Sequence, residues 1–459
     1  MIEVLTILLL TTLQFLCGFG VLNLLKVYFH PAICLSVSVL IGVAVFSFIP
    51  FLLQLAYVPL TEITVFSGII VSTILLSTKS GKAILVLFHK LKTSHFRLKL
   101  YELPFLLLIA FMVFLSVWRC YYYPPTPRDL TSGAEVIAEY AIKEKTMINS
   151  VFSVDLSTTN NQFKPPFITC LQIIYKYAGF PFGQVWLSTV FICFLVFLYK
   201  VLCLRLHKSI AGFLLVIFVA IPEMFGYTIM ALFDYSNSVF FCLSLYFLFD
   251  YFKNGQNNHL VLAGIFMGIA TYIRSETLVL AGFMFPALLF YWSKKGLFKN
   301  VIRDAAYFLG PSLFIYLLSI TIYINLYLPS EYPFSTLLNE KLSNLAPLYQ
   351  RLTDMTGKLL LAGDTLTYYG YFVFLFILVL AVNTFLKNAW NKDSLNWLFA
   401  VFVVYVGIPF LGYLFPLYDL DNSTKRGLFK IFPLMLLFMA NSRILVSISE
   451  RIKKWEVSR

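Results

Sequence analysis

Charge is what this sequence has least of. Only 12% of its 459 residues are Asp, Glu, Lys or Arg, whereas 60% are hydrophobic and the mean hydropathy is +0.83. A soluble core of this length does not need repeated apolar runs that are long enough to cross a bilayer. Because lipid cannot satisfy backbone polar groups, these runs must be spanning helices rather than open sheet. The sequence therefore predicts an all-α, multi-pass integral membrane protein.

Several catalytic motifs are also absent from the sequence. It contains no H-E-x-x-H, no P-loop and no G-x-S-x-G, which argues against a metalloprotease, an ATP-driven transporter and a serine hydrolase. The seven cysteines form no C-x-x-C pair, and most lie inside apolar runs as small hydrophobic residues. The first apolar run lacks the basic flank and the cleavage site of a secretory signal, so we expect a retained span.

The apolar runs give about 13 candidate spans of ~20 residues each. When the spans alternate, the basic segments 79–99, 205–208, 293–303, 387–392 and 450–459 all fall on one side, which the positive-inside rule makes cytoplasmic. The net charge of +13 thus reports topology and does not predict a nucleic-acid partner. The predicted spans are 4–28, 33–57, 63–78, 103–119, 184–204, 210–226, 237–252, 258–273, 277–292, 304–328, 367–387, 396–416 and 428–447.

The opposite, outer side holds the two longest polar loops, 120–183 and 329–366, and no histidine. Base chemistry on that side would therefore fall to Asp or Glu. This asymmetry favours a reaction site that faces outward over a pore. The outer carboxylates include Asp129, Asp155, Asp234, Glu276, Asp354, Asp364, Asp419 and Asp421.

The first outer loop begins with "PPTPRDLTSGAEVIAEYAIKEK" and predicts a short amphipathic helix on the outer face. Its apolar side is formed by Ala134, Ile137, Ala138 and Ala141. Ser132 and Glu135 have capping-box spacing, so Glu135 is expected to cap the helix. Glu139 stands four residues before Lys143 and is expected to pair with it on the solvated face. Asp129 is either an N-cap of this helix or a catalytic base, and the residues alone leave both open.

Further along, Lys164 precedes two prolines and a second predicted interfacial helix. Lys164 would meet a lipid phosphate at headgroup level, or it would simply snorkel. Asp234 stands at the outer start of a span, and Arg274 and Glu276 interrupt two apolar runs. An ionisable residue at membrane depth suggests a functional site, whereas the alternative for Arg274 and Glu276 is a water-exposed turn.

The order of these features resembles the C-type glycosyltransferase superfamily, and within it the protein O-mannosyltransferases and the lipid A aminoarabinose transferases. The resemblance rests on an Asp shortly after a span, an outer amphipathic helix, "KPP", an Asp at the outer end of a later span and the turn in "GIFMGIATYIR". It covers 103–292 well, and "KRGLFKIFPLMLL" more weakly. It divides the chain into N-terminal helices (1–101) outside the resemblance, a catalytic core (102–328), a second outer loop (329–366) and C-terminal helices with a basic tail (367–459).

The resemblance implies a glycosyltransferase with a helical-bundle fold in a bacterial cytoplasmic (inner) membrane. Such an enzyme moves a sugar, with inversion, from a polyprenyl-phosphate donor to a glycan, lipid or protein acceptor on the non-cytoplasmic face. It implies Asp129 as the catalytic base, without the second acid of the family's D-E pair, because this chain has Leu130 there. No cofactor is predicted, and no sequence feature supports a divalent metal. The implied substrate-binding residues are Lys164, Asp234, Arg274, Glu276 and Arg426.

Two other functions fit parts of the pattern. An O-antigen polymerase or ligase is also multi-pass, but typically has one dominant outer loop with several arginines, whereas 329–366 holds only Arg351. A secondary transporter would predict paired ionisable residues near the middle of the membrane and an internal repeat. Here the ionisable residues lie at span ends, which favours the transferase.

Overall fold

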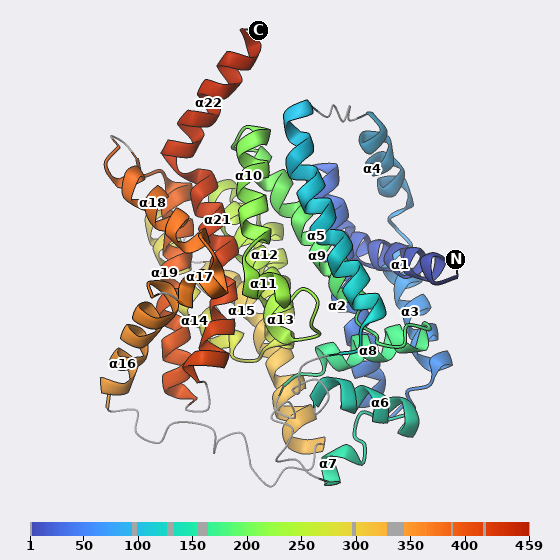
Figure 1. Ribbon diagram of the computed structural model, residues 1–459. Helices are drawn as coiled ribbons and strands as arrows, with labels where there is room; N and C mark the ends of the chain where they lie inside the picture. Colours follow the sequence, from blue (N-terminus) through green and yellow to red (C-terminus); the bar gives the residue numbers. More distant parts are fainter. Residues whose placement is uncertain are drawn as a thin grey trace.

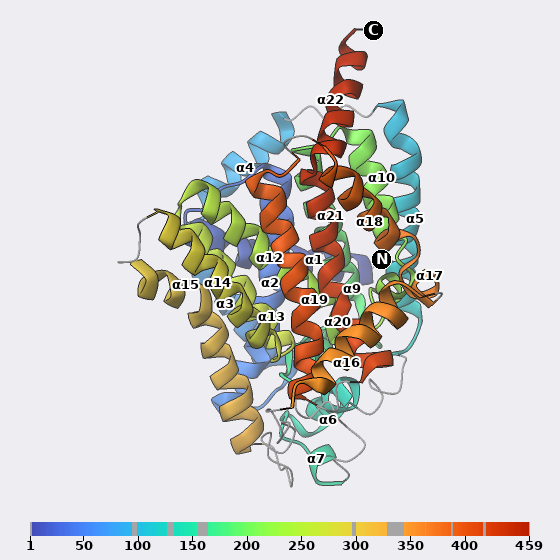
Figure 2. The same cartoon turned by 90° about the vertical axis from the view of Figure 1, so that its left-hand side faces the viewer.

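The structure is a computed structural model, and it describes residues 2–93, 99–125, 133–154, 164–295, 300–327, 344–362, 364–386, 389–415 and 419–458. Within these ranges the chain forms helices and their connections, with no β-strand. The predicted all-α class is therefore confirmed for the described residues. Figures 1 and 2 show the helices gathered into one bundle, with the C-terminal helix projecting from one end.

The helices follow the apolar runs of the sequence. The first part of the chain forms α1 (Ile2–Leu24), α2 (Pro31–Leu55), α3 (Glu62–Ser77), α4 (Gly81–Thr93), η1 (Leu100–Glu102), α5 (Leu103–Tyr122), α6 (Glu135–Glu144), α7 (Val151–Val154), α8 (Phe167–Tyr177), α9 (Val185–Cys203), α10 (Lys208–Val219) and α11 (Pro222–Gly226). The second part forms α12 (Phe233–Asn254), α13 (Asn257–Ile273), α14 (Thr277–Lys295), α15 (Val301–Tyr316), η5 (Leu317–Tyr327), α16 (Ala346–Asp354), η7 (Met355–Leu360), α17 (Asp364–Tyr369), α18 (Phe372–Thr384), α19 (Lys392–Leu414), η8 (Leu420–Thr424), α20 (Lys425–Gly427), η9 (Leu428–Lys430), α21 (Ile431–Asn441) and α22 (Arg443–Val457).

The helix lengths make this a multi-pass membrane protein. Among the described residues, six helices are long and apolar enough to cross a bilayer, or up to eight if two bent pairs each form one span. One pair, Glu62–Ser77 with Gly81–Lys92, bends by 82°, and the other, Leu420–Asn441 with Arg443–Val457, bends by 54°. Four apolar helices are shorter, and at 1.5 Å per residue the shortest spans only about 18 Å. The finer count of thirteen spans stays a prediction.

The first two helices pack at very short range. A Cβ atom added at Gly18 of α1 would lie 1.8 Å from the carbonyl oxygen of Ser38, and one added at Gly42 of α2 would lie 1.9 Å from that of Gln14. Only glycine lets the two backbones approach this closely, as at small-residue contacts between membrane helices. The N-terminal helices also join the rest of the bundle, because Gln14 donates a hydrogen bond of 3.1 Å to the hydroxyl of Tyr175 on α8.

The outer helix predicted after residue 132 is present as α6, and its expected apolar face is buried: Ala134, Ile137, Ala138 and Ala141 are each at most 6% exposed. The capping box predicted for Glu135 involves Ser132, which lies outside the described residues. The side chain of Glu135 contacts Gln172 and Lys176 of α8. Glu139 likewise pairs with Lys176 rather than with Lys143.

The second predicted interfacial helix is α8, and it lies in the interior of the molecule. All residues from Phe167 to Tyr175 are buried, because α8 packs between α2, α6 and α9. Its polar residues Gln172 and Lys176 contact α6, and Gln172 also accepts a hydrogen bond of 3.1 Å from the indole of Trp186. The prediction of a helix is confirmed, and its interfacial position stays a prediction.

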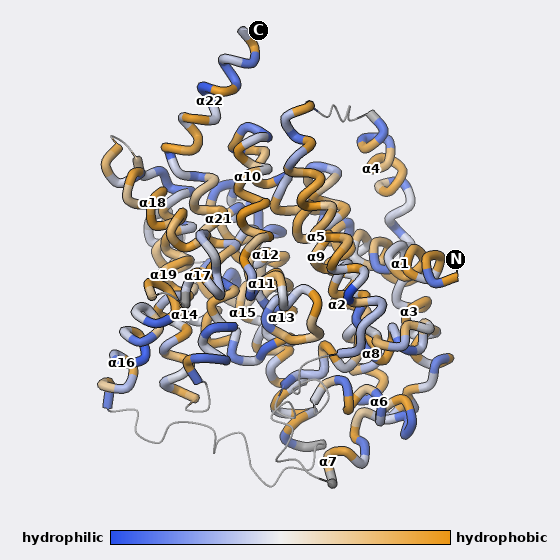
Figure 3. The backbone as a smooth tube through the Cα atoms, in the orientation of Figure 1, coloured by the Kyte–Doolittle hydropathy of each residue, from blue (hydrophilic) through white to orange (hydrophobic). Residues whose placement is uncertain are grey.

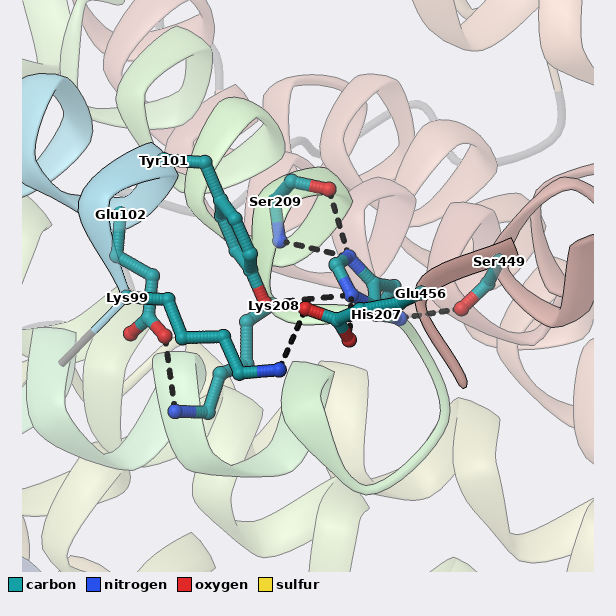
Figure 4. A network of polar contacts seen from close by, with 8 residues as sticks. All are labelled: Lys99, Tyr101, Glu102, His207, Lys208, Ser209, Ser449 and Glu456. Atoms are coloured by element: carbon teal, nitrogen blue, oxygen red, sulfur yellow. Dashed lines mark hydrogen bonds and ion pairs between the residues drawn. The ribbon is translucent and has the colours of Figure 1, made fainter. Parts of the chain in front are cut away.

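One end of the bundle is rich in cations, and we call it the basic end; it holds Lys99, Arg205, Lys208, Lys253 and the cations of α22. Hydrophilic residues gather along α22 at this end (Figure 3). A polar network holds α22 in place: Glu456 contacts Lys99 and accepts a hydrogen bond of 3.2 Å from His207, while Ser449 accepts one from the His207 backbone (Figure 4). This network fixes α22 against the first turn of α10.

Candidate functional site

The site is built around the first turns of α12, at the end of that helix away from the basic end. Asp234 lies in the first turn and is only 2% exposed. One turn later, Asn237 donates hydrogen bonds to the carbonyl of Ala270 (2.6 Å) and to the hydroxyl of Thr277 (2.9 Å). Ser238 donates one of 2.9 Å to the carbonyl of Phe429. These two buried side chains fix the α13–α14 junction and the η9 segment against α12.

The α13–α14 junction supplies Arg274 and Glu276. Arg274 follows the last residue of α13 in an extended conformation and is 6% exposed. Its guanidinium contacts Asp234 through Nη1 and Glu276 through Nε, so it lies between two carboxylates. The alternative of a water-exposed turn is therefore wrong for Arg274, because the connection between these helices is folded into the bundle.

The late segment 425–430 supplies two more cations. Arg426 is 6% exposed, its Nη1 atom lies 3.7 Å from Oδ2 of Asp234, and its Nε donates a hydrogen bond of 3.2 Å to the carbonyl of Asn422. Lys430 is 1% exposed and follows Arg426 by four residues, the spacing that places two side chains on one helix face. Its charge interacts with those of Arg274, Glu276 and Asp234. Lys430 was not among the residues selected from the sequence. The signal for it is the spacing of four residues between Arg426 and Lys430.

Lys164 reaches the same place from the segment before α8. Its Nζ atom lies 4.7 Å from the centre of the Phe233 ring, and Phe233 directly precedes Asp234 in the chain. Burial lowers the pKa of Lys164 to about 8; Arg274 and Arg426 also lower it, and Asp234 and Glu276 oppose them. A lysine with this pKa is charged at neutral pH and loses its proton under mildly alkaline conditions.

We call these six side chains the buried charge cluster: Lys164, Asp234, Arg274, Glu276, Arg426 and Lys430. Four are cations and two are carboxylates, which leaves an excess of two positive charges among them. Asp234, Arg274, Arg426 and Lys430 are buried, whereas Lys164 and Glu276 are partly exposed. Buried charged groups are stable only when they are paired or hydrogen-bonded. The helix α12 has 22 residues, or about 33 Å at 1.5 Å per residue, so the cluster and Lys253 stand roughly one bilayer core apart.

The structure thus brings together five of the residues selected from the sequence, which are Lys164, Asp234, Arg274, Glu276 and Arg426. The sixth, Asp129, lies outside the described residues, as does Ser132. The described histidines all lie away from the cluster: His207 and His259 contact Glu456 and Asp250, His30 lies near Lys200, and His89 is on α4.

The donor set of the cluster suits an anion better than a metal ion. Across the described ranges, no three His, Cys, Asp or Glu side chains are close enough to hold a metal. The two carboxylates of the cluster are both engaged by Arg274, whereas lysine and arginine side chains supply most of its polar groups. Arginine and lysine at helix junctions are the usual partners of phosphate.

Comparisons with protein-family models, with curated proteins and with solved structures found no match to this chain. The functional inference therefore rests on the residues of the cluster and on the sequence resemblance.

Proposed function

We propose that this protein is a membrane glycosyltransferase that moves a sugar from a polyprenyl-phosphate donor to a hydroxyl of a glycan, lipid or protein acceptor. The observation that carries the proposal is the buried charge cluster, an anion site with four cations at the end of the bundle opposite the basic end. The positive-inside rule makes the basic end cytoplasmic, so the reaction would face outward, from a bacterial cytoplasmic (inner) membrane.

The charge of the cluster suits the change that the donor undergoes. A polyprenyl-phosphate sugar is a phosphodiester with one negative charge, and loss of the sugar leaves a phosphate monoester that approaches two. An excess of two positive charges stabilises the departing phosphate more than the bound donor, which is the requirement for catalysis. The long prenyl chain would lie between spans, in lipid.

Each side chain has a distinct task under this proposal. Asp234 and Glu276 hold the Arg274 guanidinium in one orientation, so they are positioning residues. Lys164, Arg274, Arg426 and Lys430 would contact the phosphate. Asp129 would take the proton from the acceptor hydroxyl as its oxygen attacks the anomeric carbon, and the single displacement predicts inversion. A transporter is disfavoured, because the cluster lies at the end of α12 rather than midway along it.

The central test is transfer by the purified protein in nanodiscs, with a panel of synthetic polyprenyl-phosphate sugars. We expect release of polyprenyl phosphate with one donor, and Lys430→Ala should lower kcat/KM by about 10²-fold, because a cation aimed at the leaving group is lost. The matched control is Lys358→Ala, which removes an exposed lysine of η7 whose ionic partner among the described residues is Asp354 of α16. Folded protein without turnover on the whole panel, or equal losses in the two variants, would contradict the proposal.

The pH dependence of the reaction gives a second test. Because Lys164 loses its proton as pH rises through about 8, kcat/KM should fall about tenfold between pH 7 and pH 9. The ratio kcat/KM reports the free enzyme, in which this pKa applies. Lys164→Arg keeps the positive charge and should weaken this alkaline limb, and because Lys430 is a second lysine in the same cluster, Lys164→Arg/Lys430→Arg should remove it. Profiles that coincide for the two proteins would exclude Lys164 as the titrating group.

The outward orientation is tested by labelling single cysteines in intact cells. Tyr349→Cys, at a 71% exposed position on α16, should react with a membrane-impermeant maleimide from outside. Lys453→Cys, on the exposed side of α22 at the basic end, should react only after the membrane is opened. The native cysteines give little background, because six are buried and Cys203 is half-buried. The opposite pattern of labelling would reverse the topology and place the cluster on the cytoplasmic face.

A further inference from the structure

A cavity of about 370 Å³ lies at the basic end, where α9, α12, α19 and α21 meet. It is separated from the buried charge cluster by at least about 18 Å along α12, the rise from Asp234 to Tyr246, and has no part in the proposed reaction. Its apolar wall includes Tyr246, Phe249, Trp397 and Leu437, with the rings of Phe249 and Trp397 in edge-to-face contact at 4.8 Å. Its volume is within the range of small-molecule sites.

The rim of the cavity is charged. Arg205 pairs with Asp393, and the Nζ atom of Lys253 lies 3.9 Å from the same carboxylate, so two cations share one anion. Their side chains are 42% and 55% exposed, which leaves donor groups accessible from the cavity. The remaining acid of the rim, Asp250, is engaged elsewhere, by His259 and by a hydrogen bond of 2.9 Å from Asn254. The rim therefore places the donor groups of two cations, Arg205 and Lys253, beside the apolar wall.

We propose that this cavity binds the phosphodiester headgroup of a membrane phospholipid. Arg205 and Lys253 contact the phosphate, which has one negative charge, and the first carbons of the acyl chains lie against Phe249, Trp397 and Leu437. Three features select this ligand: the paired cations, the apolar wall beside them, and a position at the end of spanning helices, where headgroups of the basic-side leaflet lie. A free phosphate ion would use the rim and leave the wall without a partner.

The test is native mass spectrometry of the full-length protein in detergent, titrated with dihexanoyl phosphatidylglycerol. Arg205→Ala/Lys253→Ala should weaken binding at least about tenfold, which corresponds to ~1.4 kcal/mol. The matched control is Lys82→Ala/Lys453→Ala, which removes two cations of α4 and α22 that do not line the cavity. In a parallel titration, inorganic phosphate should compete poorly, because it cannot use the apolar wall.

A steric variant tests the cavity without a change of charge. Leu204 lines the cavity and is 61% exposed, so Leu204→Trp should fill its mouth and weaken lipid binding by a similar factor, whether or not the double variant folds. Equal losses in the control pair, unchanged binding in Leu204→Trp, or competition by inorganic phosphate as strong as by lipid would each overturn the proposal. The last of these outcomes would identify a site for a free anion instead.

Discussion

Asp129→Asn is expected to lower the rate of sugar transfer by about 10²–10⁴-fold, the usual contribution of a general base. The amide keeps the size and the hydrogen-bonding capacity of the side chain and removes its ability to accept a proton. The rate of the chemical step should be measured in single turnovers with saturating donor, and size-exclusion chromatography should show that the variant is folded.

The matched control for this experiment is Asp155→Asn, a second carboxylate of the same outer loop. It should leave the rate within a few-fold of the unmodified protein. Both residues lie outside the described part of the chain, so the prediction rests on the sequence alone. Unchanged turnover in Asp129→Asn would remove this residue as the base, and equal losses in both variants would point to the loop as a whole.

Arg274→Ala is expected to destabilise the protein by about 3–5 kcal/mol, the penalty for leaving a buried charge without its partner. The variant would leave Asp234, which is 2% exposed, without its Nη1 contact and Glu276 without its Nε contact. The measurement is the midpoint of thermal unfolding in detergent. Arg426→Ala should have a smaller effect, because Arg426 stands 3.7 Å from Asp234 and Arg274 still neutralises that carboxylate.

A double substitution separates the buried charge from other consequences of losing the arginine. Adding Asp234→Asn to Arg274→Ala removes the uncompensated charge and should recover part of the lost stability. The matched control is Arg451→Ala, which removes an exposed arginine from α22 and should change the midpoint little. A loss in Arg274→Ala no larger than in the control would show that the Asp234–Arg274 pair does not hold the bundle together.

Part of the cluster was predictable because Asp234, Arg274 and Glu276 stand within or beside apolar runs. Burying an ionisable side chain is unfavourable, so Asp234 and Arg274 stand out in the sequence by their rarity alone. Lys430 was not selected from the sequence because it lies within "LFKIFPLMLL", where a single lysine is typical of the boundary of a span. Which of the selected side chains meet could be inferred only through the family resemblance, since Lys164 and Arg426 are 262 residues apart in the sequence.

The errors arose where tertiary contacts replaced local ones. The rule for pairs four residues apart considers one helix only, and it assigned Glu139 to Lys143. In the folded protein Lys176 of α8 lies against both Glu135 and Glu139 and is itself shielded from water. The sequence assigned 79–99 only to the basic side, whereas the structure forms α4 there, at 82° to α3.

The pairing of Asp234 with Arg274 has a consequence for how the chain enters the membrane during synthesis. The two residues are carried by α12 and by the turn after α13, which are neighbours in sequence and in space. On the insertion scale, a lone charge at the centre of a spanning helix costs about 2.5–3.5 kcal/mol. A hairpin that inserts with both residues can neutralise them against each other before Arg426 and Lys430 have been translated. The anion site would then reach its full positive charge only when the last spans join the bundle.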